Sequence, residues 1–259
     1  MKEPIGIIDS GVGGLTIASV LIKELPNESI IYLADSKNCP YGEKSAQQIY
    51  SLTGKMMNFL LKRNIKLLII ACNTITVTCI DKLREDYPNL PIIGIVPVIK
   101  TAVKSSRNKK IGVFSTAVTA ESKYQKDLIK EFAKDCSVIN EGSSRLVPLI
   151  EKIDFEGVNK VLSQELRIFK DSKVDVLALG CSHFPLIKNR IQKHLPNVLI
   201  LDSGDAVVRQ VQRILEHNKM LSNSDNASYN FYTTGSLESL KYFVSKLTNK
   251  AKLSRISLL

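Results

Sequence analysis

Near its beginning the chain reads Ile5-Gly6-Ile7-Ile8-Asp9-Ser10, and the same pattern returns as Ile111-Gly112-Val113-Phe114-Ser115-Thr116. Two further pairs keep nearly the same offset: Ile92 with Val198, and Cys72 with Cys181. Landmarks that share one spacing indicate an internal duplication of about one domain length. The chain is therefore expected to fold as two similar lobes.

Short apolar runs alternate with longer amphipathic stretches in both halves, which is typical of α/β proteins with parallel sheets. The expected strands are 5–8, 30–34, 66–71 and 92–95 in the first half, and 110–114, 137–140, 175–179 and 198–201 in the second. The expected helices include 14–25, 45–63, 122–134 and 155–171. Residues 74–80 are rich in β-branched side chains, yet their repeat partner, 182–194, has helical spacing, so both are predicted to be helical.

The predicted fold class is α/β, with two similar three-layer lobes that have mainly parallel sheets. The lobes are expected to be related by pseudo-two-fold symmetry, with an active site in the cleft between them. The first lobe should comprise 1–97 plus 210–259, and the second 98–209. The tail adds a strand at 230–233 and a helix at 237–247, which should pack back onto the first lobe.

The composition describes a folded protein with a basic surface. Hydrophobic residues make up 44% and charged residues 24% of the 259, which is near the globular average and argues against disorder. The net charge of +11 comes partly from lysines spread along one expected helix, such as Lys123, Lys126 and Lys130, with few aromatics nearby. Such lysines are typical of a solvated helix face, so nucleic-acid binding is not expected.

No long apolar run or signal-like segment is evident, so a cytoplasmic protein without a membrane partner is predicted. In a reducing compartment the five cysteines are better interpreted as thiols than as disulfides. Two of them have a distinctive position, because Cys72 follows the apolar run 67–71 and Cys181 follows 176–180. Ligands bind at such strand ends, where a helix N-terminus favours the thiolate form.

Two thiols at equivalent points of a duplicated chain suit one particular chemistry, which is inversion at a carbon centre. One thiolate can remove a proton and an opposed thiol can return one to the other face, whereas a single base returns it to the same face. Backbone amides and side chains near the substrate carboxylate would stabilise the carbanion-like transition state. A lone cysteine would more often be a small buried hydrophobe.

Four motifs carry a family resemblance: Asp9-Ser10-Gly11-Val12-Gly13-Gly14-Leu15-Thr16, Cys39-Pro40-Tyr41-Gly42, Ala71-Cys72-Asn73-Thr74 and Gly180-Cys181-Ser182-His183-Phe184-Pro185. With these motifs the chain resembles the glutamate racemases of the aspartate/glutamate racemase superfamily, from about residue 5 to residue 209. The resemblance implies interconversion of L-glutamate and D-glutamate for bacterial peptidoglycan, with no cofactor. No metal site is expected, because no second close Cys/His cluster accompanies Cys181 and His183. A homodimer is one assembly that it allows.

The resemblance also implies roles for individual residues. Cys72 and Cys181 become the catalytic acid/base pair. The substrate contacts become Asp9, Ser10, Tyr41, Gly42, Asn73, Thr74, Ser182 and His183, with Thr116 and Thr119 as outer contacts. The chain departs from the family pattern at Ser182, where threonine is usual, and at 141–145, the segment that precedes Glu151.

Three alternatives stay open at this point. An aspartate racemase of the same superfamily usually has an acidic residue two positions after the second cysteine, where this chain has His183. A non-catalytic module that binds anions or nucleic acid would not need Cys72. A cysteine hydrolase would use Cys181 with His183 and would form an acyl intermediate.

Overall fold

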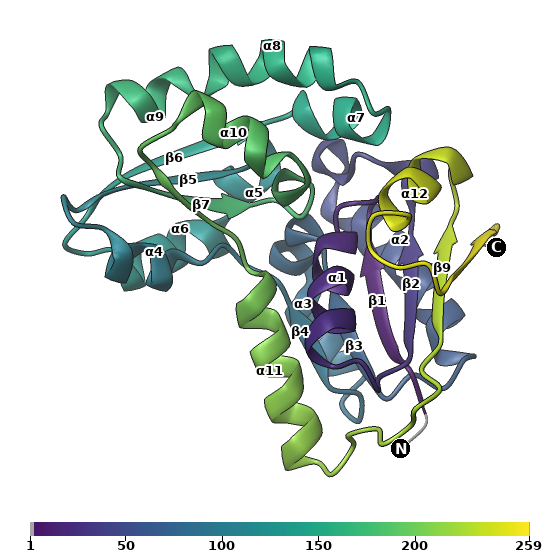
Figure 1. The fold of residues 1–259 in the computed structure, drawn as a ribbon. Coiled ribbons are helices and arrows are strands. Elements are labelled where there is room, and N and C mark those ends of the chain that lie inside the picture. Colours follow the sequence, from purple (N-terminus) through teal and green to yellow (C-terminus); the bar gives the residue numbers. More distant parts are fainter. Residues whose placement is uncertain (1–2, 259) are drawn as a thin grey trace. The chain divides into compact units, whose positions relative to one another are not determined.

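The computed structural model describes residues 3–258, which divide into two compact units (Figure 1). One unit runs up to Ile95 and resumes at Gly204, and the other is Val96–Ser203. All strands that pair in either unit are parallel, so the expected α/β class with parallel sheets is confirmed. In the described part of the chain, no helix is long and apolar enough to cross a membrane.

The first unit is built on a sheet in the order β10-β9-β2-β1-β3-β4. Its strands are β1 (Ile5–Asp9), β2 (Ile30–Ala34), β3 (Leu67–Ile70), β4 (Ile92–Gly94), β9 (Tyr229–Thr233) and β10 (Ala251–Arg255). Strands β1, β2 and β3 are buried along their whole length, which explains why they are nearly continuous apolar runs. The tail strand β9, expected at 230–233, pairs with β2, so the tail packs onto the first unit.

The second unit is built on a sheet in the order β6-β5-β7-β8. Its strands are β5 (Lys110–Thr116), β6 (Ser137–Ser143), β7 (Val176–Gly180) and β8 (Leu199–Leu201). This order repeats β2-β1-β3-β4 strand for strand. In each sheet the strand that comes first along the chain, β1 or β5, has a strand on both sides. The topology therefore confirms the duplication, and β3 and β7 occupy equivalent places in their sheets.

Helices cover both sheets. Those of the first unit are α1 (Leu15–Glu24), α2 (Ala46–Leu61), α3 (Asn73–Asp86), α11 (Gly204–His217) and α12 (Leu237–Val244). Helices α2 and α3 pack over a core that includes Ile8, Leu33 and Ile70. Helices α1 and α11 pack against each other and against strands of the same sheet (Figure 1). Helix α3 contains the β-branched stretch 74–80, so that prediction is confirmed.

The helices of the second unit are α4 (Ile99–Ser105), α5 (Ala117–Glu121), α6 (Lys123–Phe132), α7 (Leu146–Glu151), α8 (Phe155–Glu165), α9 (Arg167–Asp171) and α10 (Lys188–His194). Helices α4 and α6 contribute to a core with Val113 of the central strand. The next residue, Phe114, faces the other way and contacts Phe169 and Phe184, with ring centroids 5.6 and 4.8 Å apart. Alternate residues of β5 thus build the two apolar layers of a three-layer unit.

Two expected helices differ from the structure. The stretch 155–171 is divided at Leu166 into α8 and α9. After Cys181, the chain forms a short 3-10 helix, Phe184–Ile187, before α10 begins. An α-helical bond to the Cys181 carbonyl would have to come from the nitrogen of Pro185, which has no hydrogen. Phe184 donates to that carbonyl instead, at 3.1 Å.

Candidate active site

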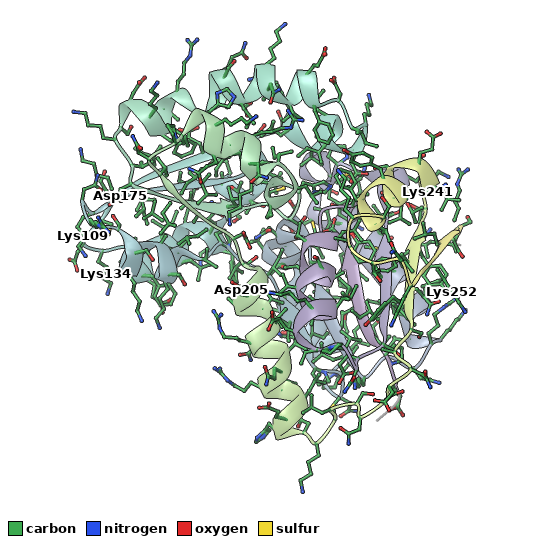
Figure 2. All side chains as sticks on the ribbon, in the orientation of Figure 1. Lys109, Lys134, Asp175, Asp205, Lys241 and Lys252 are labelled. Carbon is green, nitrogen blue, oxygen red and sulfur yellow. The ribbon has the colours of Figure 1, made fainter. Side chains whose placement is uncertain are left out.

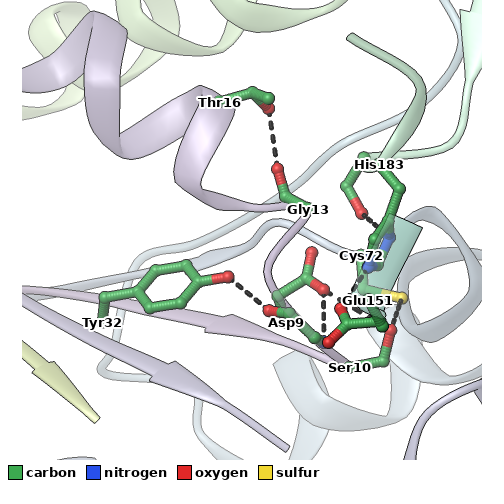
Figure 3. A network of polar contacts seen from close by, with 10 residues as sticks. Asp9, Ser10, Gly13, Thr16, Tyr32, Cys72, Glu151 and His183 are labelled. Carbon is green, nitrogen blue, oxygen red and sulfur yellow. Dashed lines mark hydrogen bonds and ion pairs between the residues drawn. The ribbon is translucent and has the colours of Figure 1, made fainter. Parts of the chain in front are cut away.

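The loop that follows β1 is organised by Asp9. This residue is fully buried, and its Oδ1 accepts hydrogen bonds from the Gly11 amide at 2.7 Å and from the Ser10 hydroxyl at 3.4 Å (Figure 3). A Cβ atom at Gly14 would lie 2.7 Å from the Ala71 Cβ, which is closer than real contacts allow. The loop therefore needs a glycine where it passes the end of β3 and enters α1.

Cys72 lies at the end of β3 and is the N-cap of α3. The side chain is buried, and its Sγ lies 3.5 Å from the Ser10 hydroxyl oxygen (Figure 3). Asn73 and Thr74 form the first turn of the helix and are also buried. Within residues 3–258, the Asn73 side-chain nitrogen Nδ2 is buried and has no hydrogen-bond partner. An unsatisfied buried donor beside a thiol fits a place for an acceptor of a ligand.

Cys79 lies on the same helix but has a different environment. Its Sγ donates to the Ile75 carbonyl at 3.2 Å, and burial raises the pKa of the thiol to about 11. The Cys79 thiol therefore stays protonated near neutral pH and is unsuited to act as a base. Cys79 packs in the core of the first unit.

The raised pKa of Cys79 predicts a loss of stability at high pH. In the unfolded chain a cysteine ionises near pH 8.5, so the stabilisation is complete below about pH 8.5 and is lost as the pH rises toward 11. We expect Cys79→Ala to flatten this part of the profile of unfolding free energy against pH. Urea unfolding of both proteins between pH 7.5 and 10.5 measures the difference. If the two profiles of unfolding free energy against pH were parallel, the raised pKa of the Cys79 thiol would be contradicted.

Cys181 occupies the equivalent place at the end of β7. It is buried, as are Ser182 and His183 that follow it. The His183 ring nitrogen Nε2 lies 2.6 Å from Glu151 Oε1, and its Nδ1 lies 3.5 Å from the Ser182 hydroxyl (Figure 3). The imidazole is thus held at both nitrogens, and the carboxylate can stabilise its charged form. Glu151 is the last residue of α7.

A Cβ atom at Gly180 would lie 2.8 Å from both the Pro97 Cγ and the Ser115 Cβ. The residue before Cys181 must therefore be a glycine for β7 to end in this position. Thr116 and Thr119, the outer contacts of the prediction, are buried and lie beside the same sheet end. Their hydroxyl oxygens are 2.9 Å apart, and Thr116 caps α5.

Tyr41 and Gly42 lie in a short 3-10 helix, Tyr41–Glu43. The Tyr41 hydroxyl donates to Asp35 Oδ2 at 2.6 Å, and Asp35 also accepts from Asn38 and Thr234. Burial, followed by the Asp35 charge, raises the pKa of the Tyr41 phenol, so this group stays a donor. The hydroxyl is committed to Asp35, which leaves the ring and the main chain of Tyr41 for a substrate contact.

The sequence analysis missed Asp35, Thr234 and the pairing of His183 with Glu151. Asp35 comes directly after β2, and Asp9 is the last residue of β1, so a search of the strand ends for functional residues could have found Asp35. Thr234 follows β9 in the same way. The contact between His183 and Glu151 spans 32 positions of the sequence and has no local signal.

Each unit therefore has a buried thiol at the end of an equivalent strand, and the Cys72 thiol lies within hydrogen-bonding distance of the Ser10 hydroxyl. Within residues 3–258, which include all five cysteines, no disulfide forms. A duplicated α/β chain with a thiol at each of two equivalent strand ends offers two groups that acid/base chemistry could use.

Comparisons with known proteins identify the family of the chain. Residues 6–211 match the family described as Asp/Glu/Hydantoin racemase. A glutamate racemase of Listeria monocytogenes is 36% identical over 246 residues, which cover 93% of this chain and 92% of that protein. The chain belongs to the Asp/Glu/Hydantoin racemase family, so it is an isomerase of the racemase type.

Solved structures give the same result. Glutamate racemase isoform RacE1 from Bacillus anthracis superposes with a TM-score of 0.89 at 32% identity, covering 100% of this chain and 99% of that one. The Francisella tularensis glutamate racemase, solved in complex with D-glutamate, superposes with a TM-score of 0.86 at 32% identity, covering 99% and 98%. An allantoin racemase from Klebsiella pneumoniae, at 17% identity and a TM-score of 0.56, shares the fold.

Proposed function

We propose that this chain is a glutamate racemase that interconverts L-glutamate and D-glutamate with Cys72 and Cys181 as the acid/base pair. The observation that carries the proposal is the presence of a buried thiol at the end of each of two equivalent strands, β3 and β7. The substrate is inferred from relatives named glutamate racemase, whose alignments cover most of the chain. In a bacterium, the product would serve peptidoglycan synthesis.

The chemistry is a pair of proton transfers. One Sγ, as thiolate, takes the α-proton of glutamate, and the electron pair of the C–H bond delocalises into the α-carboxylate. The other Sγ, as thiol, then gives its proton to the opposite face of the same carbon, and the two cysteines have exchanged protonation states. The thiols must therefore approach one substrate from opposite faces. No cofactor takes part in this scheme.

The remaining residues bind and orient the substrate in this proposal. The Asp9 carboxylate accepts from the α-ammonium group, and the Asn73 amide nitrogen, which is buried and unsatisfied within the described chain, donates to a carboxylate. Further donors come from Ser10, Thr74, Ser182 and the main chain at Tyr41 and Gly42. His183, held by Glu151 at 2.6 Å, assists the Cys181 thiol. A cytoplasmic location and a homodimeric state belong to the same proposal.

Incubation with L-glutamate or D-glutamate in heavy water tests the proposal. In a two-base mechanism the product acquires solvent deuterium at the α-carbon, while the remaining substrate stays largely protiated early in the reaction. Circular dichroism follows the inversion and mass spectrometry follows the label. Aspartate is the matched control substrate. Inversion of aspartate without inversion of glutamate would instead favour an aspartate racemase.

A further inference from the structure

A cavity of about 570 Å³ lies in the first unit, at the carboxyl ends of three neighbouring strands. Its wall includes Asp35 after β2, Thr234 after β9 and Ile256 after β10. The carboxyl edge of a parallel sheet is the usual place for a ligand, and the volume suits a small molecule. The proposed racemase chemistry does not use this cavity.

The cavity is lined by an excess of positive charge. Lys37, Lys55 and Arg255 all contribute to its wall, and within residues 3–258 none of them forms an ion pair with a carboxylate. The one carboxylate in the wall, Asp35, accepts from Tyr41, Asn38 and Thr234. Two ammonium groups and a guanidinium fork suit a dianion such as a phosphate monoester.

The wall also has an apolar side. Leu52 of α2, together with Ile256 and Leu258 after β10, lines the cavity, and all three are half-buried. An inorganic anion would leave this side uncovered. We propose that the cavity binds a small organic phosphate, with the phosphate at Lys37, Lys55 and Arg255 and the apolar body against Leu52 and Leu258.

A ligand in this cavity should affect Tyr41, which is a predicted substrate contact. Asp35 is shared, because it forms part of the cavity wall and accepts the Tyr41 hydroxyl at 2.6 Å. The Lys37 amide donates to the Thr234 hydroxyl at 3.1 Å, and this hydroxyl donates to Asp35 at 2.7 Å. A phosphate that draws Lys37 toward itself shifts this chain of hydrogen bonds and, through it, the position of Tyr41.

Isothermal titration with phenyl phosphate and with inorganic phosphate tests the binding site. We expect Lys55→Ala/Arg255→Ala to weaken phenyl phosphate binding at least tenfold. The matched control is Lys62→Ala/Lys252→Ala, which removes the same charge from two exposed positions and should change the affinity less than twofold. Lys62 lies just after α2, and Lys252 lies on β10, where Figure 2 labels it. Equal weakening in both variants, or no binding to the unaltered protein, would overturn the proposal.

The apolar side predicts that phenyl phosphate binds roughly tenfold more tightly than inorganic phosphate, because burial of the ring adds a hydrophobic contribution. Equal affinities would contradict a site for organic phosphates. The effect on Tyr41 rests on the proposed function. Saturating phenyl phosphate should change KM for L-glutamate at least threefold in the original protein. The same addition should leave KM unchanged in Lys55→Ala/Arg255→Ala. An unchanged KM in the original protein would refute the coupling. Absence of any racemase activity would refute the proposed function, while the titration would still test the site.

Discussion

Replacement of either Cys72 or Cys181 by serine is expected to lower kcat/KM for inversion of glutamate about 10²- to 10⁴-fold in both directions. A serine hydroxyl matches the thiol in shape but ionises far less readily, so it cannot serve as the base, and it is a poorer acid. Loss of one thiol stops inversion, because the scheme needs a base on one face of the α-carbon and an acid on the other. Circular dichroism with L-glutamate and with D-glutamate measures both directions.

The isotope pattern of these variants distinguishes proton transfer from a binding defect. Each single variant keeps one thiol, which can still remove and return the α-proton on its own face. In heavy water, each variant should therefore replace the α-proton of one enantiomer by deuterium without inversion. The two variants should label opposite enantiomers. Cys79→Ser is the matched control, because its hydroxyl can keep the bond to the Ile75 carbonyl, and it should stay within threefold of the original activity. Retained racemisation in both Cys72→Ser and Cys181→Ser would refute the two-thiol scheme.

Much of the fold could be predicted because buried parallel strands are visible as apolar runs. The strand β2 was predicted with the bounds that it has, Ile30–Ala34, and every residue in it is buried. The duplication was visible because β1 and β5 are central strands with the same apolar pattern. The positions of Cys72 and Cys181 followed from the same signal, since each comes directly after such a run.

The parts that could not be predicted depend on contacts between distant segments. The edge strand β10 has the sequence Ala251-Lys252-Leu253-Ser254-Arg255, which has no apolar run, and it forms because its backbone pairs with β9. The commitment of the Tyr41 hydroxyl to Asp35 depends on the fold of the loop after β2. The 3-10 helix after Cys181 depends on the missing hydrogen of Pro185, although proline near a helix start normally favours an α-helix.

A buried ion pair in the first unit gives the largest expected effect on stability. Lys66 Nζ lies 2.6 Å from Glu28 Oε2, and both side chains are 2% exposed. Lys66 also donates to the Met220 carbonyl at 2.7 Å, and Glu28 Oε1 accepts from the Ser222 amide at 2.8 Å. The pair thus links the segment before β2, the segment before β3 and the connection from α11 to β9.

Lys66→Met should lower the free energy of unfolding by about 3–5 kcal/mol, because it leaves the Glu28 carboxylate buried without its counter-charge. The double variant Lys66→Met/Glu28→Gln should recover a large part of this loss, since no buried charge remains and the glutamine can still accept from Ser222. Urea unfolding of the single and double variants measures the difference. The control is Lys23→Met, which removes a partner from the exposed pair with Glu24 and should cost less than about 1 kcal/mol.

The comparison between the single and the double variant shows how the pair acts. If attraction between the charges were the main stabilising effect, the double variant would be as unstable as Lys66→Met. If desolvation of an unpaired carboxylate dominates, the double variant will lie much closer to the original protein. We expect the second result, because the glutamine can keep the hydrogen bond from the Ser222 amide and has no charge that must be buried. Equal destabilisation of both variants would contradict this explanation.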